Sequence, residues 1–167
     1  MNAKSLARLS PLAAMALVSG VVLFGARSSA AESDDHPPRA EQLEGTWRVQ
    51  VTLVNCKTGQ PVGSQFSALL TFARGGTATE TTANSFFPAQ RSPGHGAWTS
   101  EGGQSYRAAT TAFISRDGVL IRTQTITQRI EVEDDTLSST ATTEFFDPSG
   151  ALVLKGCATA TGERYKL

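Results

Sequence analysis

Side chains that could carry out catalysis or bind a metal ion are few in this chain. It contains two histidines, His36 in a polar N-terminal stretch and His95 within Ser-Pro-Gly-His-Gly. A metal or haem site could use His95, but no second histidine, cysteine or carboxylate stands near it at a spacing typical of ligands. Turn residues flank His95, so a place in a loop or at the start of a strand is the simpler interpretation. We therefore predict neither a metal ion nor a cofactor.

The two cysteines indicate a structural role rather than a catalytic one. Cys56 and Cys157 form an even pair, and such a pair in an exported chain is most simply one disulfide. A disulfide removes the thiolate that Cys–His nucleophilic catalysis needs. Two buried free thiols are the alternative.

The acidic side chains also lack a catalytic arrangement. Glu131, Glu133, Asp134 and Asp135 are close together, but their spacing matches no calcium-binding loop and fits a solvated turn. Glu144 lies in a Thr-rich run and faces outward by its parity, so we find no inward pair of carboxylates suited to acid–base catalysis. We predict no catalytic residue. An enzyme that works mainly by shaping a pocket, such as a cyclase or isomerase on a small barrel, is the least favoured function.

The N-terminus has the order of features of a secretory signal peptide. Lys4 and Arg8 precede an apolar run over residues 12–26, and small residues follow at 28–31. The apolar run is shorter than the about 20 residues that a membrane-spanning helix needs. We predict a signal peptide over residues 1–31 and export to the periplasm or the extracellular space, with an uncleaved anchor as the alternative.

The exported part begins with a polar leader over residues 32–42, followed by one domain over residues 43–167. The whole chain has 15 basic and 15 acidic residues, and loss of Lys4, Arg8 and Arg27 leaves 12 basic residues. A slightly acidic domain has no electrostatic attraction for nucleic acid or anionic lipid. We expect neither nucleic acid nor a membrane as a partner of the exported protein.

The domain has the composition and the period of β-strands. Val, Ile, Phe and many Thr fall in short alternating runs, and turn residues separate these runs. The expected strands cover residues 46–55, 65–73, 77–83, 94–100, 104–115, 119–133, 136–146 and 151–161. Gly75-Gly76 and Asp117-Gly118 predict two-residue type I′ turns. A change of phase within residues 119–133 predicts a β-bulge near Thr123 to Thr125.

Sequential strands joined by hairpins leave two open edges unless the sheet closes on itself. We therefore predict an all-β fold, an eight-stranded antiparallel up-and-down barrel, with a two-sheet sandwich as the alternative. In a closed barrel the first and last strands pair, and antiparallel partners have residue numbers with a nearly constant sum. Trp47 with Arg164 and Cys56 with Cys157 fit nearly the same register. Parity places the first pair inward and both cysteines outward.

Gly45-Thr46-Trp47 at the start of the first strand resembles the N-terminal signature of lipocalin-like, calycin-type barrels. In those barrels a basic side chain from near the end of the barrel packs on the tryptophan, and Arg164 stands at the matching place. The resemblance implies a cation–π stack of Arg164 on Trp47 at the closed end, with a structural role for both. The same Gly-Thr-Trp start also resembles avidin-type barrels and small periplasmic barrels that inhibit bacterial metalloproteases.

The predicted interior combines small side chains on the last two strands with aromatic walls. An eight-stranded barrel with such a lining can hold one small ligand, although side chains can also fill it. We predict a cavity for a small, mostly apolar ligand. The residues predicted to line it are Phe66, Phe72, Trp98, Tyr106, Ile130, Ser139, Thr143 and Phe145. The alternative function is a protein-interaction module, such as a protease-inhibitor-like barrel whose leader docks on a protein partner.

Overall fold

The computed structural model describes residues 42–84, 86 and 88–167. The predicted signal peptide, and the predicted leader apart from Gln42, lie outside the described residues. The described residues form strands and turns. None of them belongs to a helix of the length and apolarity needed to cross a membrane.

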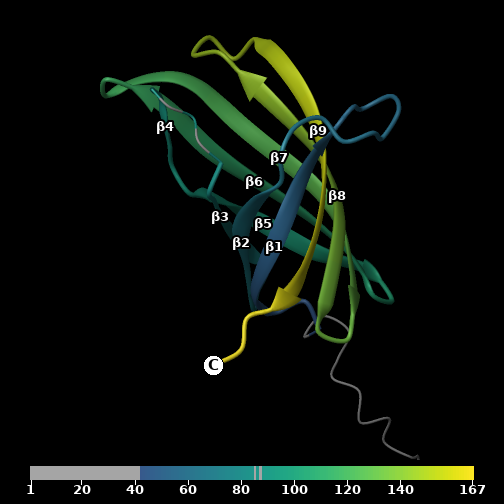
Figure 1. Cartoon of the computed structure of the whole chain (residues 1–167). Helices are drawn as coiled ribbons and strands as arrows, with labels where there is room; N and C mark the ends of the chain where they lie inside the picture. The colour runs from purple at the N-terminus through teal and green to yellow at the C-terminus, as the bar shows by residue number, and fades with distance from the viewer. Residues whose placement is uncertain (1–41, 85, 87) are drawn as a thin grey trace, which may run out of the picture. The chain divides into compact units, whose positions relative to one another are not determined.

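The described chain folds into a closed antiparallel barrel (Figure 1). The strands are β1 (Gly45–Val54), β2 (Phe66–Ala73), β3 (Thr77–Thr82), β4 (Gln90–Arg91), β5 (Gly94–Gly102), β6 (Ser105–Arg116), β7 (Val119–Glu133), β8 (Thr136–Phe146) and β9 (Leu152–Arg164). All except β4 form the ring, which closes where β1 pairs with β9 and where β6 pairs with β7. The prediction of an eight-stranded up-and-down barrel is confirmed, and the sandwich alternative is wrong.

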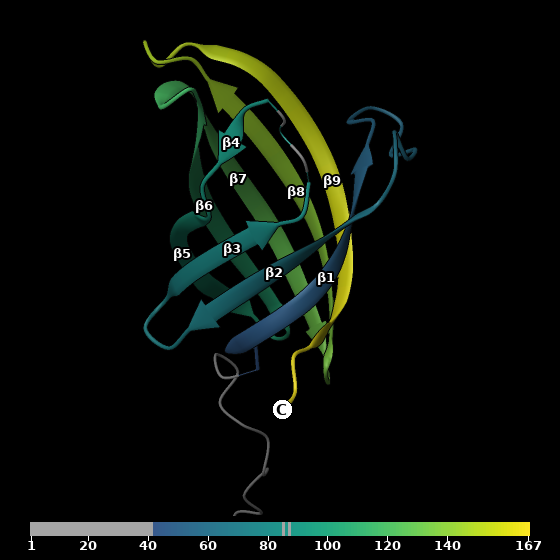
Figure 2. The same cartoon turned by 60° about the vertical axis from the view of Figure 1, so that its left-hand side comes forward.

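The short strand β4 was not predicted, because residues 84–93 read as an irregular connector. It pairs through Gln90 and Arg91 with Ser115 and Ile114 of β6. The pairing of β5 with β6 does not reach that far, since its last pair on this side is His95 with Thr111. Figure 2 shows β4 at the end of the barrel where the β6–β7 and β8–β9 hairpins turn. The connector thus extends the barrel wall beyond the start of β5.

The turns follow the local sequence with two corrections. Asp117 and Gly118 have φ angles of 52° and 77°, and the residues on either side of them pair, as predicted for a type I′ turn. The β2–β3 turn has three residues instead of two, because Ala73 pairs with Thr77 and Arg74 joins the glycines in the loop. The bulge in β7 comes earlier than predicted, since the register shift leaves Ile121 without a partner. A bulge beside a hairpin adds the local twist that a long, curved strand pair needs.

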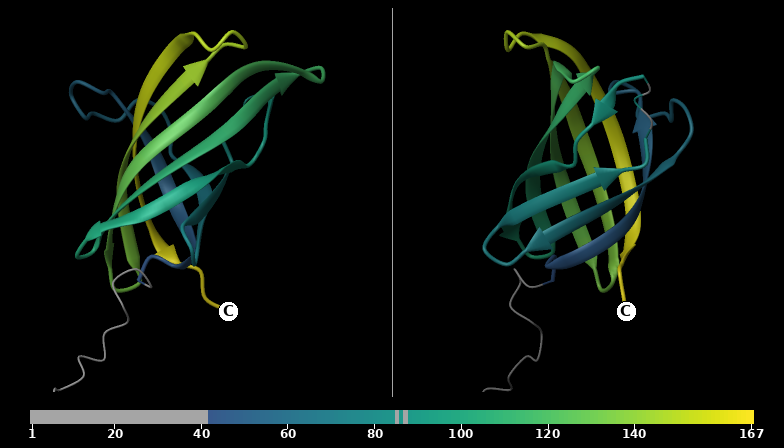
Figure 3. Two further views of the ribbon diagram at one scale, coloured as in Figure 1. Left: turned by 180° about the vertical axis from the view of Figure 1, so that it is seen from behind. Right: turned by 90° about the vertical axis from the view of Figure 1, so that its left-hand side faces the viewer.

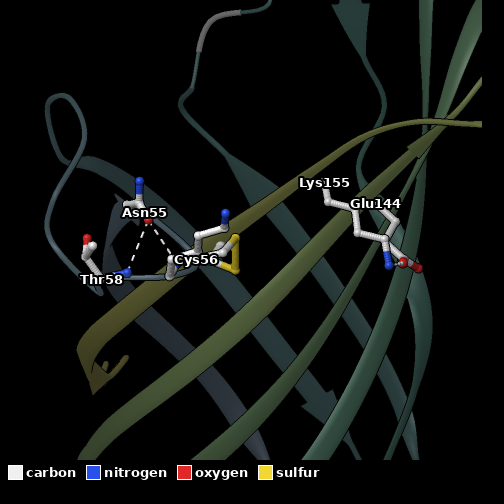
Figure 4. Close-up of a disulfide and its surroundings, with 7 residues drawn as sticks. Asn55, Cys56, Thr58, Glu144 and Lys155 are labelled. Carbon is white, nitrogen blue, oxygen red and sulfur yellow. Dashed lines mark hydrogen bonds and ion pairs between the residues drawn. A yellow bond between two sulfur atoms is a disulfide. The ribbon is translucent and has the colours of Figure 1, made fainter.

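The seam between β1 and β9 has the predicted register. Trp47 pairs with Arg164, and at the other end Val54 pairs with Cys157. Cys56, just past the end of β1, forms a disulfide with Cys157 over a Cα–Cα distance of 5.2 Å, which confirms the predicted bond. Beside it, Asn55 Oδ1 accepts hydrogen bonds from the backbone N–H groups of residues 57 and 58 (Figure 4).

The two ends of the barrel differ in their connections. The β2–β3 and β7–β8 turns lie at the end where β1 begins and β9 finishes, which we call the closed end. The β6–β7 and β8–β9 hairpins reach the opposite end, which we call the open end (Figure 3). Inward positions alternate regularly, as in β6, where every second residue from Tyr106 to Ile114 is buried. The height of a residue between the two ends therefore decides what its inward side chain meets.

Candidate functional site

The closed end of the barrel is filled by large side chains. Trp47 and Tyr106 are fully buried, and Phe72 is only 1% exposed. The ring centroids of Trp98 lie 6.3 Å from Phe72 and 5.9 Å from Tyr106, in edge-on contacts. Trp98 Nε1 donates a hydrogen bond of 2.9 Å to the carbonyl oxygen of Ala73. This packing forms a floor for the space toward the open end.

Arg164 covers this floor in the way that the resemblance implies. Its Cζ lies 4.3 Å from the ring centroid of Trp47. The guanidinium donates hydrogen bonds to Asp135 Oδ1 and to the carbonyl oxygens of Gln42 and Glu44. Gly45 has a φ of 121°, and a Cβ there would lie 3.0 Å from Arg164 Nη1. The glycine of the Gly-Thr-Trp start is therefore needed both for its backbone angle and to make room for the arginine.

The titratable groups with shifted pKa values do not line the cavity described next. Hydrogen bonds from Lys166 and Arg164 lower the pKa of Asp135 in the β7–β8 turn. A hydrogen bond from the Ser149 hydroxyl, helped by the backbone of Ala151, lowers the pKa of Asp147 in the β8–β9 turn. Burial raises the pKa of Tyr106, and the charge of Arg164 opposes that rise. These groups stabilise turns and the closed end.

A cavity of about 300 Å³ lies between the floor and the open end. Its walls are mostly apolar and come from β1, β2, β3, β7, β8 and β9, together with the connector around β4. The apolar lining residues are Val49, Val51, Leu53, Phe66, Ala68, Leu70, Phe86, Ile126, Ala141, Phe145, Leu154, Gly156, Ala158 and Ala160. The small inward residues of β8 and β9, which are Ser139, Ala141, Gly156, Ala158 and Ala160, leave this space, while Phe145 and Leu154 line it closer to the open end.

The predicted lining residues fall into two groups. Phe66, Ser139, Thr143 and Phe145 lie on the cavity wall. Phe72, Trp98, Tyr106 and Ile130 point inward as well, but they belong to the packed core at the closed end. Parity along a strand distinguishes the two faces of a barrel but not the height along its axis. Contact of any of these residues with a ligand stays a prediction.

A buried ion pair in the cavity wall was missed by sequence reasoning. The side chains of Arg91 and Glu80 are each 5% exposed and form a salt bridge. Arg91 also donates to Gln124 Oε1 and, over 3.1 Å, to the carbonyl oxygen of Ser92. Gly94 leaves room for the carboxylate, because a Cβ there would lie 3.0 Å from Cγ and Cδ of Glu80. One arginine thus joins β3 to β7, which are not neighbours in the sheet.

The inward position of Glu80 could have been predicted from the sequence. Leu70 and Glu80 are partners across the β2–β3 hairpin, and Leu70 lies on the apolar face of its strand. A carboxylate opposite an inward leucine is itself inward, and a buried carboxylate needs a partner. Arg91 gave no such signal, since it stands in a connector without periodicity.

Two polar residues in the cavity wall have no hydrogen-bond partner among the residues that the structure describes. Gln128 and Ser139 are 6% and 7% exposed, and both line the cavity. Among the described residues, neither side chain makes a hydrogen bond, and the polar atoms of both remain accessible from the cavity. Thr110 Oγ1, on the neighbouring strand β6, is also buried without a partner among the described residues.

The remaining candidates for chemistry lie elsewhere. His95 is exposed on β5, opposite Thr79 and Thr111, and His36 lies outside the described residues. Glu144 pairs with Lys155 on the neighbouring strand, near the disulfide (Figure 4). Among the described residues, no group of three His, Cys, Asp or Glu side chains is placed to hold one metal ion. The cavity and its polar residues are therefore the candidate site.

Comparison with known proteins does not assign this chain to a family. No protein-family model matches it, and no curated protein matches it significantly. The closed eight-stranded barrel and the Arg164–Trp47 contact are consistent with a lipocalin-like fold. A fold alone does not define a function, so the function has to be argued from the cavity.

Proposed function

We propose that this protein binds a small, mostly apolar ligand inside its barrel. The observation that supports this proposal is the cavity of about 300 Å³ with a mainly apolar wall. That volume is at the lower end of the range of about 300–1,000 Å³ for small-molecule sites. At about 30 Å³ for each water-sized group, it suits a ligand of roughly ten non-hydrogen atoms. Binding is non-covalent burial and needs no catalytic group.

The apolar wall allows a prediction of how the dissociation constant changes with the length of an alkyl ligand. Burial of one methylene group contributes about 0.8 kcal/mol, which is about a fourfold change in the dissociation constant. We therefore expect a homologous series of alkyl ligands to bind about fourfold more tightly for each added methylene, until the chain fills the cavity.

The proposed compartment is the periplasm or the extracellular space. The Cys56–Cys157 disulfide supports it, because disulfides persist mainly in oxidising compartments. Export would also remove residues 1–31. The intact mass of the protein recovered from its exporting host would show whether this segment is cleaved.

Native mass spectrometry of that same material tests ligand binding. We expect a mass increment from a co-purified small molecule that is lost on denaturation. A matched pair of variants links the increment to the cavity. Ala141→Phe places a ring inside, and Thr140→Phe places the same ring on the outer face one residue away. We expect at least tenfold weaker binding for A141F and unchanged binding for T140F, and equal binding by both variants would contradict the proposal.

The protein-interaction alternative rests on the polar leader, which apart from Gln42 lies outside the described residues. It therefore stays a prediction from the sequence. The same is true of a small-barrel cyclase or isomerase, since neither gains support from a described residue.

A further inference from the structure

The unpaired polar side chains in the cavity indicate the chemistry of the ligand's head group. We propose that the ligand carries an uncharged group that both donates and accepts hydrogen bonds, such as a carboxamide or an alcohol, bound by Gln128 and Ser139. This inference rests on the proposed ligand-binding function and adds the class of ligand to it.

Gln128 and Ser139 are at least nine-tenths buried, line the cavity and have no hydrogen-bond partner among the described residues. A buried polar group without a partner is unfavourable, so it is normally satisfied by protein, water or ligand. The amide of Gln128 offers both donors and an acceptor, and the hydroxyl of Ser139 offers one donor and acceptor sites. The complementary ligand group therefore also donates and accepts.

The two side chains stand close enough to share one head group. Gln128 pairs with Ala141 across β7 and β8, and Ile130 pairs with Ser139. Gln128 and Ser139 are thus diagonal neighbours on the inner face, a relation with a Cα separation of about 7–8 Å. Ile130 belongs to the packed core, so this polar pair stands next to the floor of the cavity.

The charged residues of the cavity argue against an ionic head group. Of the described residues that line it, Glu80 and Arg91 carry charge, and they pair with each other. Arg91 also directs donors to Gln124 and to the backbone of Ser92. A ligand carboxylate or ammonium would therefore bring an uncompensated charge into a buried site, which is strongly unfavourable.

The apolar residues near the open end set the direction of the ligand. Leu53 lies near the end of β1, and Phe145 and Leu154 lie near the β8–β9 turn; all three line the cavity. The head group would therefore enter first and reach Gln128 and Ser139, while the alkyl part would lie among these residues.

The test is a titration of the full-length exported protein at pH 8 with octanamide, octanenitrile and octanoate. The three share the chain length but differ in the head group, since the nitrile only accepts hydrogen bonds and octanoate is charged. Calorimetry gives the dissociation constants, and the side-chain amide signals of Gln128 in NMR spectra report contact directly. We expect octanamide to bind at least tenfold more tightly than the other two.

Two matched variants assign the effect to one residue. Gln128→Leu should reduce the affinity for octanamide to that for octanenitrile, while the nitrile affinity changes less than twofold. Thr127→Leu, on the outer face of the same strand, should leave all three affinities unchanged. Equal affinities for the three probes in the unmodified protein, or tightest binding of octanoate, would overturn the head-group inference and leave the ligand-binding function standing. Absence of binding by all three probes would instead contradict the proposed function.

A charge variant gives an independent readout. Glu80→Gln leaves the charge of Arg91 without its partner, so octanoate should gain at least tenfold in affinity relative to octanamide. An unchanged preference in folded E80Q would contradict the argument that this ion pair excludes ionic head groups. Should E80Q fail to fold, the Gln128→Leu titration still decides the inference.

Discussion

The two halves of the barrel use the same alternating strand pattern with different side-chain sizes. At the closed end, Trp47, Phe72 and Tyr106 are at most 1% exposed and fill the interior. Toward the open end, β8 and β9 present small residues such as Ala141 and Ala158, and a cavity of about 300 Å³ remains. The number of strands fixes the width of the barrel, so the size of the inward residues decides whether it is filled. The packed core and the cavity are therefore separated along the barrel axis.

The buried polar groups of the described residues also differ between the two halves: those at the closed end are hydrogen-bonded, and two of those in the cavity are not. At the closed end, Trp47 Nε1 donates to the carbonyl oxygen of Leu43 over 2.9 Å, and the Arg164 guanidinium has three acceptors. In the cavity, Gln128 and Ser139 lack partners among the described residues. Binding sites commonly retain such locally unfavourable features, because function limits how far stability can be improved.

The largest loss of stability should come from truncating a side chain of the packed floor at the closed end. Trp47→Ala removes a fully buried indole and should lower the free energy of unfolding by about 3–5 kcal/mol. Phe145→Ala should cost only about 1–2 kcal/mol, because Phe145 is half-buried and its loss enlarges a cavity that already exists. Denaturant unfolding of both variants measures the difference. Equal losses would show that the two halves do not differ in their contribution to stability.

Removal of the disulfide measures how much the β1–β9 seam near the open end contributes to stability. Cys56 and Cys157 are 101 residues apart in the chain, and replacing both by serine should lower stability by about 2–5 kcal/mol. The cation–π contact at the other end of the seam should persist, because it does not depend on the disulfide. Thermal unfolding measures the loss, and the near-ultraviolet circular dichroism of the tryptophans reports the closed end. A changed tryptophan signal in the folded variant would show that the two ends are coupled.

A variant in the cavity wall should raise the free energy of unfolding, whereas the preceding variants should lower it. Gln128→Leu replaces an amide that has no partner among the described residues with an apolar side chain in a mainly apolar wall, so it should raise the free energy of unfolding by about 1 kcal/mol. Thr127→Leu on the outer face should stay within about 0.5 kcal/mol of the unmodified protein. Denaturant midpoints of the ligand-free proteins measure both changes. A destabilised Q128L would mean that the amide already has a stabilising partner.

The smallest effect concerns pH and the closed end. Hydrogen bonds from Lys166 and Arg164 keep the pKa of Asp135 below its ordinary value. A lowered folded-state pKa stabilises the fold above the unfolded-state value of about 4, and this contribution is lost as the pH falls through the folded-state pKa.

Asp135→Asn should therefore lower the melting temperature slightly at pH 6, and the difference from the unmodified protein should shrink on acidification toward pH 3. Asp134→Asn, in the same turn, is the control, because asparagine tolerates its positive φ of 52°. A difference that grows on acidification would contradict the assignment.

The sequence alone determined the fold to a large extent. The alternation of apolar and polar residues predicted the strands and their inward faces. Asp117-Gly118 predicted a tight turn, because both residues tolerate the positive φ angles that this turn needs. Trp47, Arg164 and the cysteines predicted closure, because antiparallel pairing relates residue numbers across the seam in a fixed way. These features depend on residues close in sequence or on one simple pairing rule, so the sequence alone was enough to predict them.

The candidate site depended on the tertiary structure. Phe72, Trp98, Tyr106 and Ile130 belong to the floor rather than to the cavity wall, because the tilt and stagger of the strands decide the height of each inward residue. Arg91 reaches Glu80 only because the irregular connector folds back as β4 beside β6. The alternating pattern determined which side chains point inward. Only closure of the barrel decided which of them meet and where space remains, because packing in three dimensions depends on contacts between residues far apart in the chain.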